Sequence, residues 1–500
     1  MTATLENRRL APSGPPRPQR AARPSRRAIV LSALATLAIG LGTFAATVGP
    51  REGQLVWSDG WCYFLYARSL VVDHDTDLTR EFEELDARLP AGGLAIIALR
   101  ETQERHPATG RISFPWPIGM GLVMAPFYAA GYAVERVAAA SAGRPADTCG
   151  LIPQYFFCLG SLAYGLLGFW CTLLLCRRAA GRQEAALAAV APVAALAPVA
   201  TVATLAVLLG GPVVFYVFFH PAMAHAASFG LTALLTLLWW ESWEAGLGPR
   251  PARRMALLGL LTGLLAIMRY QNAVFGLLLL AALAGREARR AAPGAAVRAA
   301  VAGIATLLVP LAAQAAHHVA VHGLPATGVG WQGPGAFRFE QNEMDLRAPH
   351  LLGALFSCQH GAFYWAPVLA AGAAGLAWAA RRESAARVLL AVLAAQVYVI
   401  GTIVGGASGA YNWSGGNSFG MRYLAECAPF LAFGLAAAMR GAARWIGTRA
   451  WTAVLAVLVI WNGCLVLAYG MGTIDREECV TWKEMAAGAL AAAAKLLGRG

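Results

Sequence analysis

Long apolar segments recur along most of the chain and alternate with shorter polar segments that are rich in arginine. A helix needs about 20 apolar residues to cross the hydrocarbon core of a bilayer. Segments near that length lie at 28–48, 153–175, 186–206, 224–241, 255–269, 270–285, 298–317, 362–380, 388–405, 423–440 and 449–470. This pattern predicts an all-α polytopic membrane protein with about 11, and at most about 13, transmembrane helices.

Two apolar segments have a second interpretation. Residues 28–48 also resemble a cleavable signal peptide, but the many later segments favour an uncleaved first helix. Residues 117–139 are apolar enough to cross, yet a crossing there would put the arginines at 177–182 outside the cytoplasm. We therefore predict an interfacial or re-entrant element, interrupted by Pro126.

Arginine predicts the orientation, because cytoplasmic loops of membrane proteins are enriched in basic residues. With the amino end inside and the carboxyl end outside, every inner loop carries at least three arginines. They are Arg177, Arg178, Arg182, Arg250, Arg253, Arg254, Arg286, Arg289, Arg290, Arg381, Arg382, Arg387, Arg440, Arg444 and Arg449. All histidines and aspartates then fall on or beside the outer face. This one-sidedness favours chemistry at that face, although long polar loops alone would also produce it.

Composition agrees with a lipid environment. Hydrophobic residues make up 58% of the chain and charged residues 13%, whereas soluble proteins carry about 25% charge. A cytosolic enzyme and a disordered scaffold are therefore excluded. The net charge of +13 would suggest nucleic acid in a soluble protein, but here the basic inner loops explain it, and no nucleic-acid partner is expected.

Polarity divides the chain into three parts. Residues 1–27 are polar, Pro-rich and basic, which predicts a disordered arm on the cytoplasmic side. Residues 28–470 form the predicted transmembrane domain. Its long outer loops lie at about 50–116, 318–361 and 406–422. Residues 471–500 contain an amphipathic, Ala-rich helix that is expected to lie on the outer surface.

The first outer loop contains the acids of greatest interest. Asp59 follows the first apolar segment closely and precedes an aromatic stretch at 61–68, which predicts an interfacial helix. Asp59 is a candidate catalytic base, with helix capping as the alternative. Asp73, Asp75 and Asp77 form an acidic cluster that could bind acceptor or a divalent cation, or could equally be a solvated turn.

Four basic residues at predicted membrane edges are candidate ligands for an anion. Arg422 opens an apolar segment, and an ionisable residue there is usually paired or faces a wet cavity. Arg269 lies between two short apolar segments, where it marks a broken helix or reaches to the interface. His225 and His360 are functional candidates that could instead be structural.

The cysteines do not indicate a disulfide framework. Cys62, Cys149, Cys358 and Cys479 are predicted outside and could pair, but no spacing identifies the partners. The chain contains no CxxC, HExxH or P-loop pattern.

Several short motifs together resemble the C-type integral-membrane glycosyltransferases, over about residues 50–440. These motifs are the acid after the first segment, the long first outer loop, Trp-Pro-Ile-Gly at 116–119, Pro-x-x-x-His at 221–225, Leu-Phe-Ser…His-Gly at 355–361, and Gly-Gly-Asn-Ser-Phe-Gly-Met-Arg-Tyr at 415–423. Relatives in that superfamily include protein O-mannosyltransferases, aminoarabinose transferases and arabinofuranosyltransferases. The similarity is greatest to bacterial members without an assigned substrate.

The resemblance implies transfer of a sugar from a polyprenyl-phosphate donor to a glycan, lipid or protein acceptor, usually with inversion. It implies a bacterial inner membrane, with the active site facing the periplasm or exterior. The family's base maps onto Asp59. Gly60 follows it, so the Asp-Glu pair of the mannosyltransferases is absent, which argues against mannose and a protein acceptor.

The residue types fit this chemistry. Glycosidases need two carboxylates because an alcohol leaving group must be protonated, whereas phosphate leaves as a stable anion and needs one base and positive charge. Asp59 could deprotonate the acceptor hydroxyl. Arg422, with His225, His360 or Arg269, could hold the phosphate through charge-assisted hydrogen bonds.

Two other classes remain open at the level of sequence. A transporter or flippase of a lipid-linked or anionic substrate would place charges near mid-membrane and often shows inverted repeats. Arg269 favours that class, although no internal repeat is visible. A non-catalytic membrane assembly factor would tolerate replacement of its outer acids.

Overall fold

The computed structural model is nearly all helical. It describes residues 26–49, 53–88, 105–106, 109–112, 116–187, 197–323, 329–333, 336–339, 342–405, 412–442 and 445–498. Most of the predicted basic arm at 1–27 lies outside the described residues. Only Arg26 and Arg27 are within them, as the first residues of the first helix.

The helices follow the apolar segments of the sequence. Their bounds are α1 Arg26–Thr47, α2 Asp59–Arg68, α3 Thr79–Arg88, α5 Gly119–Ser141, α6 Leu151–Leu187, α7 Ala197–Leu209, α8 Val213–Phe218, α9 Ala224–Ala245, α10 Pro251–Met268, α11 Ala273–Ala288, α12 Pro293–His322, α13 Leu351–Phe356, α14 Ala362–Trp365, α15 Pro367–Ala380, α16 Ser384–Thr402, α17 Ala428–Ala442, α18 Thr448–Gly470 and α19 Trp482–Leu496. Short 3₁₀ turns at Tyr270–Asn272 and Arg422–Cys427 precede α11 and α17.

Within the described residues, six helices are long and apolar enough to cross a membrane, as a multi-pass membrane protein requires. They are Leu151–Ala180, Pro251–Met268, Pro293–Val321, Ser384–Thr402, Arg422–Ala442 and Thr448–Gly470. Shorter apolar helices lie at Leu34–Thr47, Val199–Leu209 and Pro367–Ala380. The predicted total of about 11 crossings stays a prediction.

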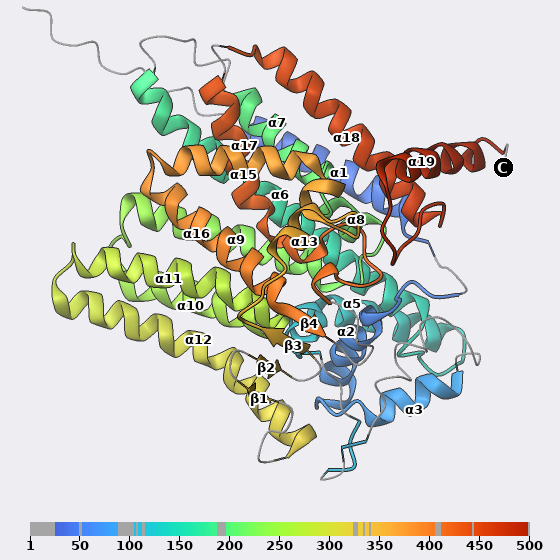
Figure 1. Cartoon of the computed structure of the whole chain (residues 1–500). Coiled ribbons are helices and arrows are strands. Elements are labelled where there is room, and N and C mark those ends of the chain that lie inside the picture. Colours follow the sequence, from blue (N-terminus) through green and yellow to red (C-terminus); the bar gives the residue numbers. More distant parts are fainter. Residues whose placement is uncertain are drawn as a thin grey trace, which may run out of the picture.

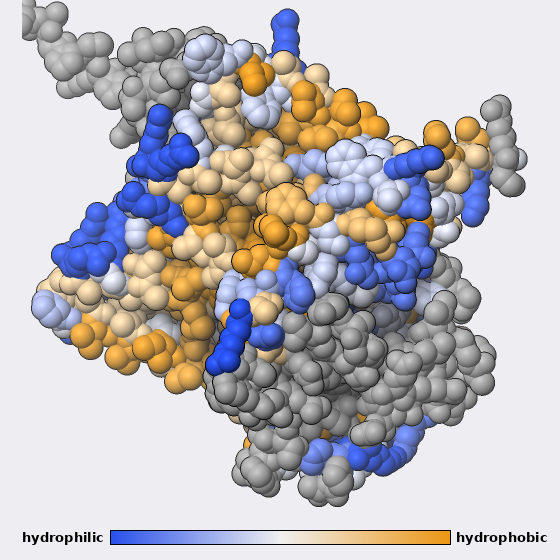
Figure 2. Space-filling model, in the orientation of Figure 1, coloured by the Kyte–Doolittle hydropathy of each residue, from blue (hydrophilic) through white to orange (hydrophobic). Residues whose placement is uncertain are grey.

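The apolar helices differ in what they contact. The most apolar parts of α12 and α18 are only 17% and 22% buried inside the protein, whereas that of the segment containing α17 is 83% buried. Apolar surface is correspondingly widespread on the face shown in Figure 2. The segment containing α17 is therefore a central element, and α12 and α18 present apolar side chains outward.

Small residues bring α17 close to its neighbour α15. A Cβ at Gly375 of α15 or at Gly434 of α17 would overlap backbone atoms of the opposite helix. Glycine permits such a close approach between membrane helices. This contact matters for the site because the turn Arg422–Cys427 leads directly into α17.

The structure shows that the predicted interfacial helix packs inside the protein, and that the predicted interruption at Pro126 is wrong. The predicted interfacial helix is α2, but its residues 60–68 are buried, and Phe64 packs edge-on against Tyr128 and Phe157. Aromatic side chains this large lose more water-exposed surface in a protein core than at an interface. Residues 117–139 are not interrupted at Pro126, because α5 continues through it and packs against α2 and α6.

A small antiparallel sheet departs from the all-α prediction. Its strands are β1 Val329–Gly333, β2 Ala336–Phe339, β3 Asn342–Asp345 and β4 Ile403–Gly405, in the order β1-β2-β3-β4. Phe337 pairs with Met344, and Met344 also pairs with Ile403. The glycine-rich sequence at 328–335 disfavours a helix there. The sheet joins the predicted third outer loop to the end of α16.

The polypeptide turns separate into two sides of the molecule. In Figure 1, the turns between α9 and α10, α11 and α12, and α15 and α16 lie toward the left, whereas the sheet lies below the centre and α2 and α3 lie toward the lower right. The first group of turns carries arginines of the predicted inner loops, and the second group belongs to the predicted outer loops.

Candidate functional site

Four elements that are far apart in the sequence meet at one cluster of charged side chains. Asp59 is the first residue of α2, His225 is near the start of α9, Arg269 ends α10, and Arg422 begins the 3₁₀ turn before α17. Gly60 helps to assemble them, because a Cβ there would meet the Cβ of Ala222 at 2.6 Å. The start of α2 therefore lies directly against the turn before α9.

Asp59 and Arg422 form an ion pair. Arg422 Nη1 lies 3.6 Å from Asp59 Oδ2, and the two side chains are 15% and 20% exposed. This separation is longer than that of a strong charge-assisted hydrogen bond. Arg422 Nε is buried and has no hydrogen-bond partner among the described residues. Asp59 therefore contacts the guanidinium through a terminal nitrogen only, and both side chains remain partly exposed.

Arg269 and Arg422 share the ring of Tyr423. The guanidinium carbon of Arg269 lies 4.7 Å from the ring centroid, and that of Arg422 lies 5.3 Å from it. Each contact is a favourable cation–π interaction, and like charges gathered around one ring repel each other. An anion that accepts hydrogen bonds from both guanidinium groups would remove that repulsion.

His225 lies against Arg269 and is fully buried. Its Nδ1 is 3.1 Å from Glu426 Oε1, and its Nε2 is 2.8 Å from Arg269 Nη1. The ring also packs against Tyr216, at a centroid distance of 4.5 Å. His225 was predicted to bind phosphate directly, but this burial places it behind Arg269 and beside protein groups.

Glu426 is a member of the cluster that sequence reasoning missed. It is 1% exposed and lies four residues after Arg422, inside the apolar segment at 423–440. A single acid within such a segment is itself a signal, since ionisable residues there are rare and usually paired. The same criterion that selected Arg422 would have selected Glu426.

His360 supports the site from the side of the third outer loop. Its backbone is left-handed (φ 64°), its side chain is fully buried, and its Nδ1 donates to the carbonyl of Ser414 at 3.2 Å. Burial, together with the nearby Arg422, lowers the pKa of His360 to about 4. The His360 side chain is therefore neutral, and in this form it holds the loop at 414–422 through Ser414.

The acidic cluster at Asp73, Asp75 and Asp77 does not join the other candidates. Asp73 forms an ion pair with Arg68, and Asp75 Oδ1 accepts from Ser69 Oγ at 2.7 Å. Asp77 pairs with Arg111 at 3.0 Å. These contacts shape the loop between α2 and α3.

Nothing in the described part of the chain groups three or more His, Cys, Asp or Glu side chains for a metal ion. The divalent cation considered from the sequence stays a prediction.

One cysteine pair is joined. Cys358 and Cys479 form a disulfide, with their Cα atoms 4.8 Å apart, and Cys62 is a buried thiol. The bond ties the loop that carries His360 to the segment before α19. Sequence alone did not identify this pair.

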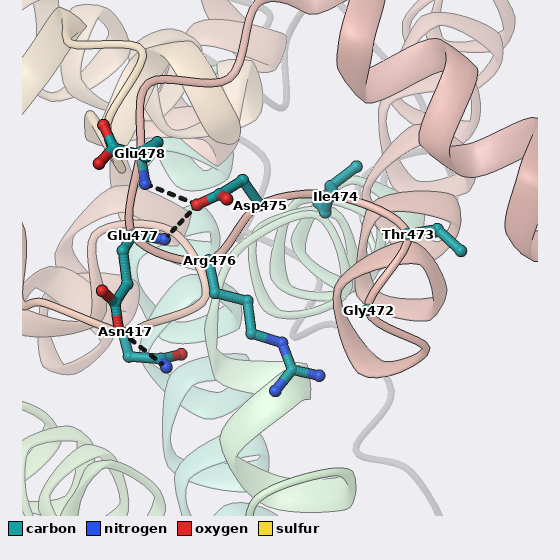
Figure 3. A pocket seen from close by; sticks show the side chains of 8 residues that line it. All are labelled: Asn417, Gly472, Thr473, Ile474, Asp475, Arg476, Glu477 and Glu478. Carbon is teal, nitrogen blue, oxygen red and sulfur yellow. Dashed lines mark hydrogen bonds between the residues drawn. The ribbon is translucent and has the colours of Figure 1, made fainter.

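An open hollow of about 590 Å³ borders the same region, lined by Asn417 and residues 472–478. In Figure 3, Asp475 accepts hydrogen bonds from the backbone of Glu477 and Glu478, and Asn417 donates to Glu477. Asn417 also accepts from Tyr469 at 2.9 Å. The hollow and Arg422 thus lie on two ends of one loop, 417–422.

Searches of known protein families, curated proteins and solved structures found no match to this chain. Its fold and its charged cluster define the class of protein: a nearly all-helical protein with several helices long and apolar enough to cross a membrane, and a partly accessible acid–arginine site.

Proposed function

We propose that the protein transfers a sugar from a polyprenyl-phosphate donor to an acceptor on the outer face of the membrane. The observation that carries the proposal is the convergence of Arg269 and Arg422 on Tyr423, with Asp59 at 3.6 Å from Arg422. Two guanidinium groups suit the two free oxygens of a phosphodiester. A carboxylate beside them suits the acceptor hydroxyl.

In the proposed reaction, Asp59 accepts the proton of the acceptor hydroxyl as its oxygen attacks the anomeric carbon of the sugar. The bond from that carbon to the phosphate oxygen breaks, and its electron pair leaves with the polyprenyl phosphate. Attack from the side opposite the phosphate inverts the anomeric centre. Arg269 and Arg422 stabilise the charge that grows on the leaving phosphate.

The ion pair between Asp59 and Arg422 gives the donor a second role. A phosphate that accepts hydrogen bonds from Arg422 competes with Asp59 for the same guanidinium. Donor binding then leaves the Asp59 carboxylate less neutralised and more able to accept a proton. Transfer is therefore expected to require donor binding before the acceptor is activated.

Location in a bacterial inner membrane, with the site outside, is part of the proposal. The arginine-bearing turns lie toward the left of Figure 1, and the disulfide Cys358–Cys479 fastens the segment that leads into α19, which lies toward the right. Basic loops favour the cytoplasm, and disulfides persist in oxidising compartments. The apolar helices would accommodate the polyprenyl tail, and an envelope glycan, lipid or protein would supply the hydroxyl.

The test compares lipid-linked sugars and envelope glycans in cells that make the wild-type protein, Asp59→Asn or Arg422→Ala. Loss of the base or of the phosphate ligand should lower transfer at least about a hundredfold, and the lipid-linked donor should accumulate. Asp345→Asn, which alters an outer-loop acid outside the cluster, is the matched control. Normal transfer by both site variants at normal protein levels would contradict the proposal.

Transport of an anionic lipid-linked substrate is the second candidate. It is favoured by the break between α10 and α11, where Arg269 has an extended backbone (φ −157°) between two apolar helices. Interrupted helices with charged groups are typical of transporter sites. A transporter would still move its substrate in Asp59→Asn, because transport requires no base.

A further inference from the structure

Glu426, His225 and Arg269 form a continuous chain of contacts behind the site. Glu426 Oε1 lies 3.1 Å from His225 Nδ1, and His225 Nε2 lies 2.8 Å from Arg269 Nη1. The three residues come from the turn before α17, from α9 and from the end of α10. One chain of hydrogen bonds therefore connects three elements of the helix bundle.

The chemistry of these groups determines where the hydrogen atoms lie. A guanidinium only donates, so the His225 nitrogen that bonds Arg269 accepts, and Nε2 at 2.8 Å is the nearer of the two. In a neutral His225, the single ring hydrogen is then on Nδ1. The Nδ1–H group donates to the Glu426 carboxylate. The second approach, 3.1 Å between Arg269 Nη1 and His225 Nδ1, is a contact without a hydrogen bond in this arrangement.

The orientation of Arg269 is fixed on two further sides. When the side-chain amide of Gln271 is oriented with its oxygen toward Arg269, this oxygen accepts from Arg269 Nε at 3.3 Å and from Nη2 at 2.9 Å. The guanidinium also lies over Tyr423. Of its five N–H groups, one on each terminal nitrogen remains for a ligand, and this pair can bind a phosphate in bidentate fashion.

Neither His225 nor Glu426 can reach a ligand itself. Their side chains are 0% and 1% exposed, whereas Arg269 is only partly buried. Both residues therefore act through Arg269. The Glu426 carboxylate also offsets the positive charge of Arg269, as the Asp59 carboxylate offsets that of Arg422.

We propose that Glu426 is a positioning residue, which acts through the Nδ1–H tautomer of His225 to hold Arg269 ready for the donor phosphate. This inference rests on the proposed function. His225 is thereby assigned to orienting Arg269, and direct binding of phosphate is left to the two arginines.

The experiment measures binding of farnesyl phosphate, and of farnesol as the uncharged control, to the full-length protein in detergent. The wild type should bind the phosphate more tightly than the alcohol. His225→Phe keeps an aromatic ring beside Tyr216 but breaks the chain, and Glu426→Leu removes the acceptor. Each should weaken binding of farnesyl phosphate about tenfold and leave farnesol unchanged.

A conservative variant separates positioning from simple structural support. Glu426→Gln keeps an oxygen that can accept from His225 Nδ1–H, so it should retain more affinity for farnesyl phosphate than Glu426→Leu. Size-exclusion chromatography and circular dichroism will show whether His225→Phe folds. If it does not, the comparison of Glu426→Gln with Glu426→Leu still tests the inference. Equal affinities in wild type, Glu426→Gln and Glu426→Leu would overturn the inference.

Two outcomes distinguish the inference from the proposed function. If the wild type does not prefer farnesyl phosphate to farnesol, the phosphate site and the proposed function both fail. If the wild type prefers the phosphate and Arg269→Ala weakens its binding, but folded His225→Phe and Glu426→Leu do not, only the positioning role fails.

Discussion

At the residue scale, each cation of the site has its own anion. Asp59 faces Arg422 directly, and Glu426 reaches Arg269 through His225. A buried charge without a partner is costly, so this pairing explains how two guanidinium groups can share one tyrosine ring. Substitutions within the cluster will consequently be non-additive, because each changes the environment of the others.

His360 should make the stability of the protein sensitive to acid. Its pKa is about 4 in the folded protein and 6.5 when unperturbed. The neutral side chain therefore contributes stability above pH 6.5, and this contribution is lost as the pH falls toward 4. We expect a loss of about 3 kcal/mol at most, measured as a fall in thermal stability in detergent between pH 7.5 and pH 4.5.

The variant His360→Asn should reduce this loss. Asparagine tolerates the left-handed backbone and can still donate to the Ser414 carbonyl, but it does not titrate in this range. His74→Asn is the matched control, because His74 is also left-handed (φ 61°) and is exposed. The same acid sensitivity in wild type and His360→Asn would show that His360 is not its source.

At the scale of elements, the contact between α15 and α17 determines where Arg422 lies. Gly434→Val would insert a side chain against the backbone of Gly372 and Leu376, which would force the helices apart. Overpacking of this kind costs about 1–3 kcal/mol, and we expect a lower melting temperature together with loss of transfer.

Gly463→Val is the matched control for that substitution. Gly463 lies on α18, is exposed, and has no atom within 4 Å of the position that a Cβ would occupy. The same valine should therefore be tolerated there. Unchanged stability and activity in Gly434→Val would show that the close approach of α15 and α17 is not required.

The sequence predicted where the helices lie along the chain better than it predicted which other elements each helix or strand contacts. Segments such as 153–175 and 449–470 are long and apolar, and they lie within α6 and α18. Burial of α2 could not be predicted, because it depends on packing against α5 and on the contact of Phe64 with Phe157 of α6. The sheet was missed for a similar reason, since β3 pairs with β4, which follows α16.

The candidate site could be predicted only in part. Asp59 and Arg422 were noticeable because ionisable residues at membrane edges are uncommon, and the structure brings them together. Glu426 was hidden within an apolar segment. The connection of His225 to Arg269 depends on how α9 packs against α10, which local sequence does not determine.

At the scale of the whole molecule, the arginine-bearing turns and the charged loops lie on opposite sides, and this arrangement predicts a labelling pattern. In a background with Cys149 and Cys464 replaced by serine, Glu83→Cys should react with a membrane-impermeant maleimide on intact spheroplasts. Arg381→Cys should react only after the membrane is opened. Both positions are exposed, so accessibility reports the side of the membrane. The reverse pattern would place Asp59 in the cytoplasm and contradict the proposed reaction.

The bond between Cys358 and Cys479 has a consequence for biosynthesis. Its two cysteines are 121 residues apart in the sequence, so the ribosome releases the second one well after the first. In the proposed topology, the bond can form only after α18 has been threaded through the membrane and Cys479 has reached the oxidising side. A nascent chain therefore keeps its His360 loop unfastened until Cys479 has been exported, and the maturing protein then depends on the oxidative folding machinery of the cell.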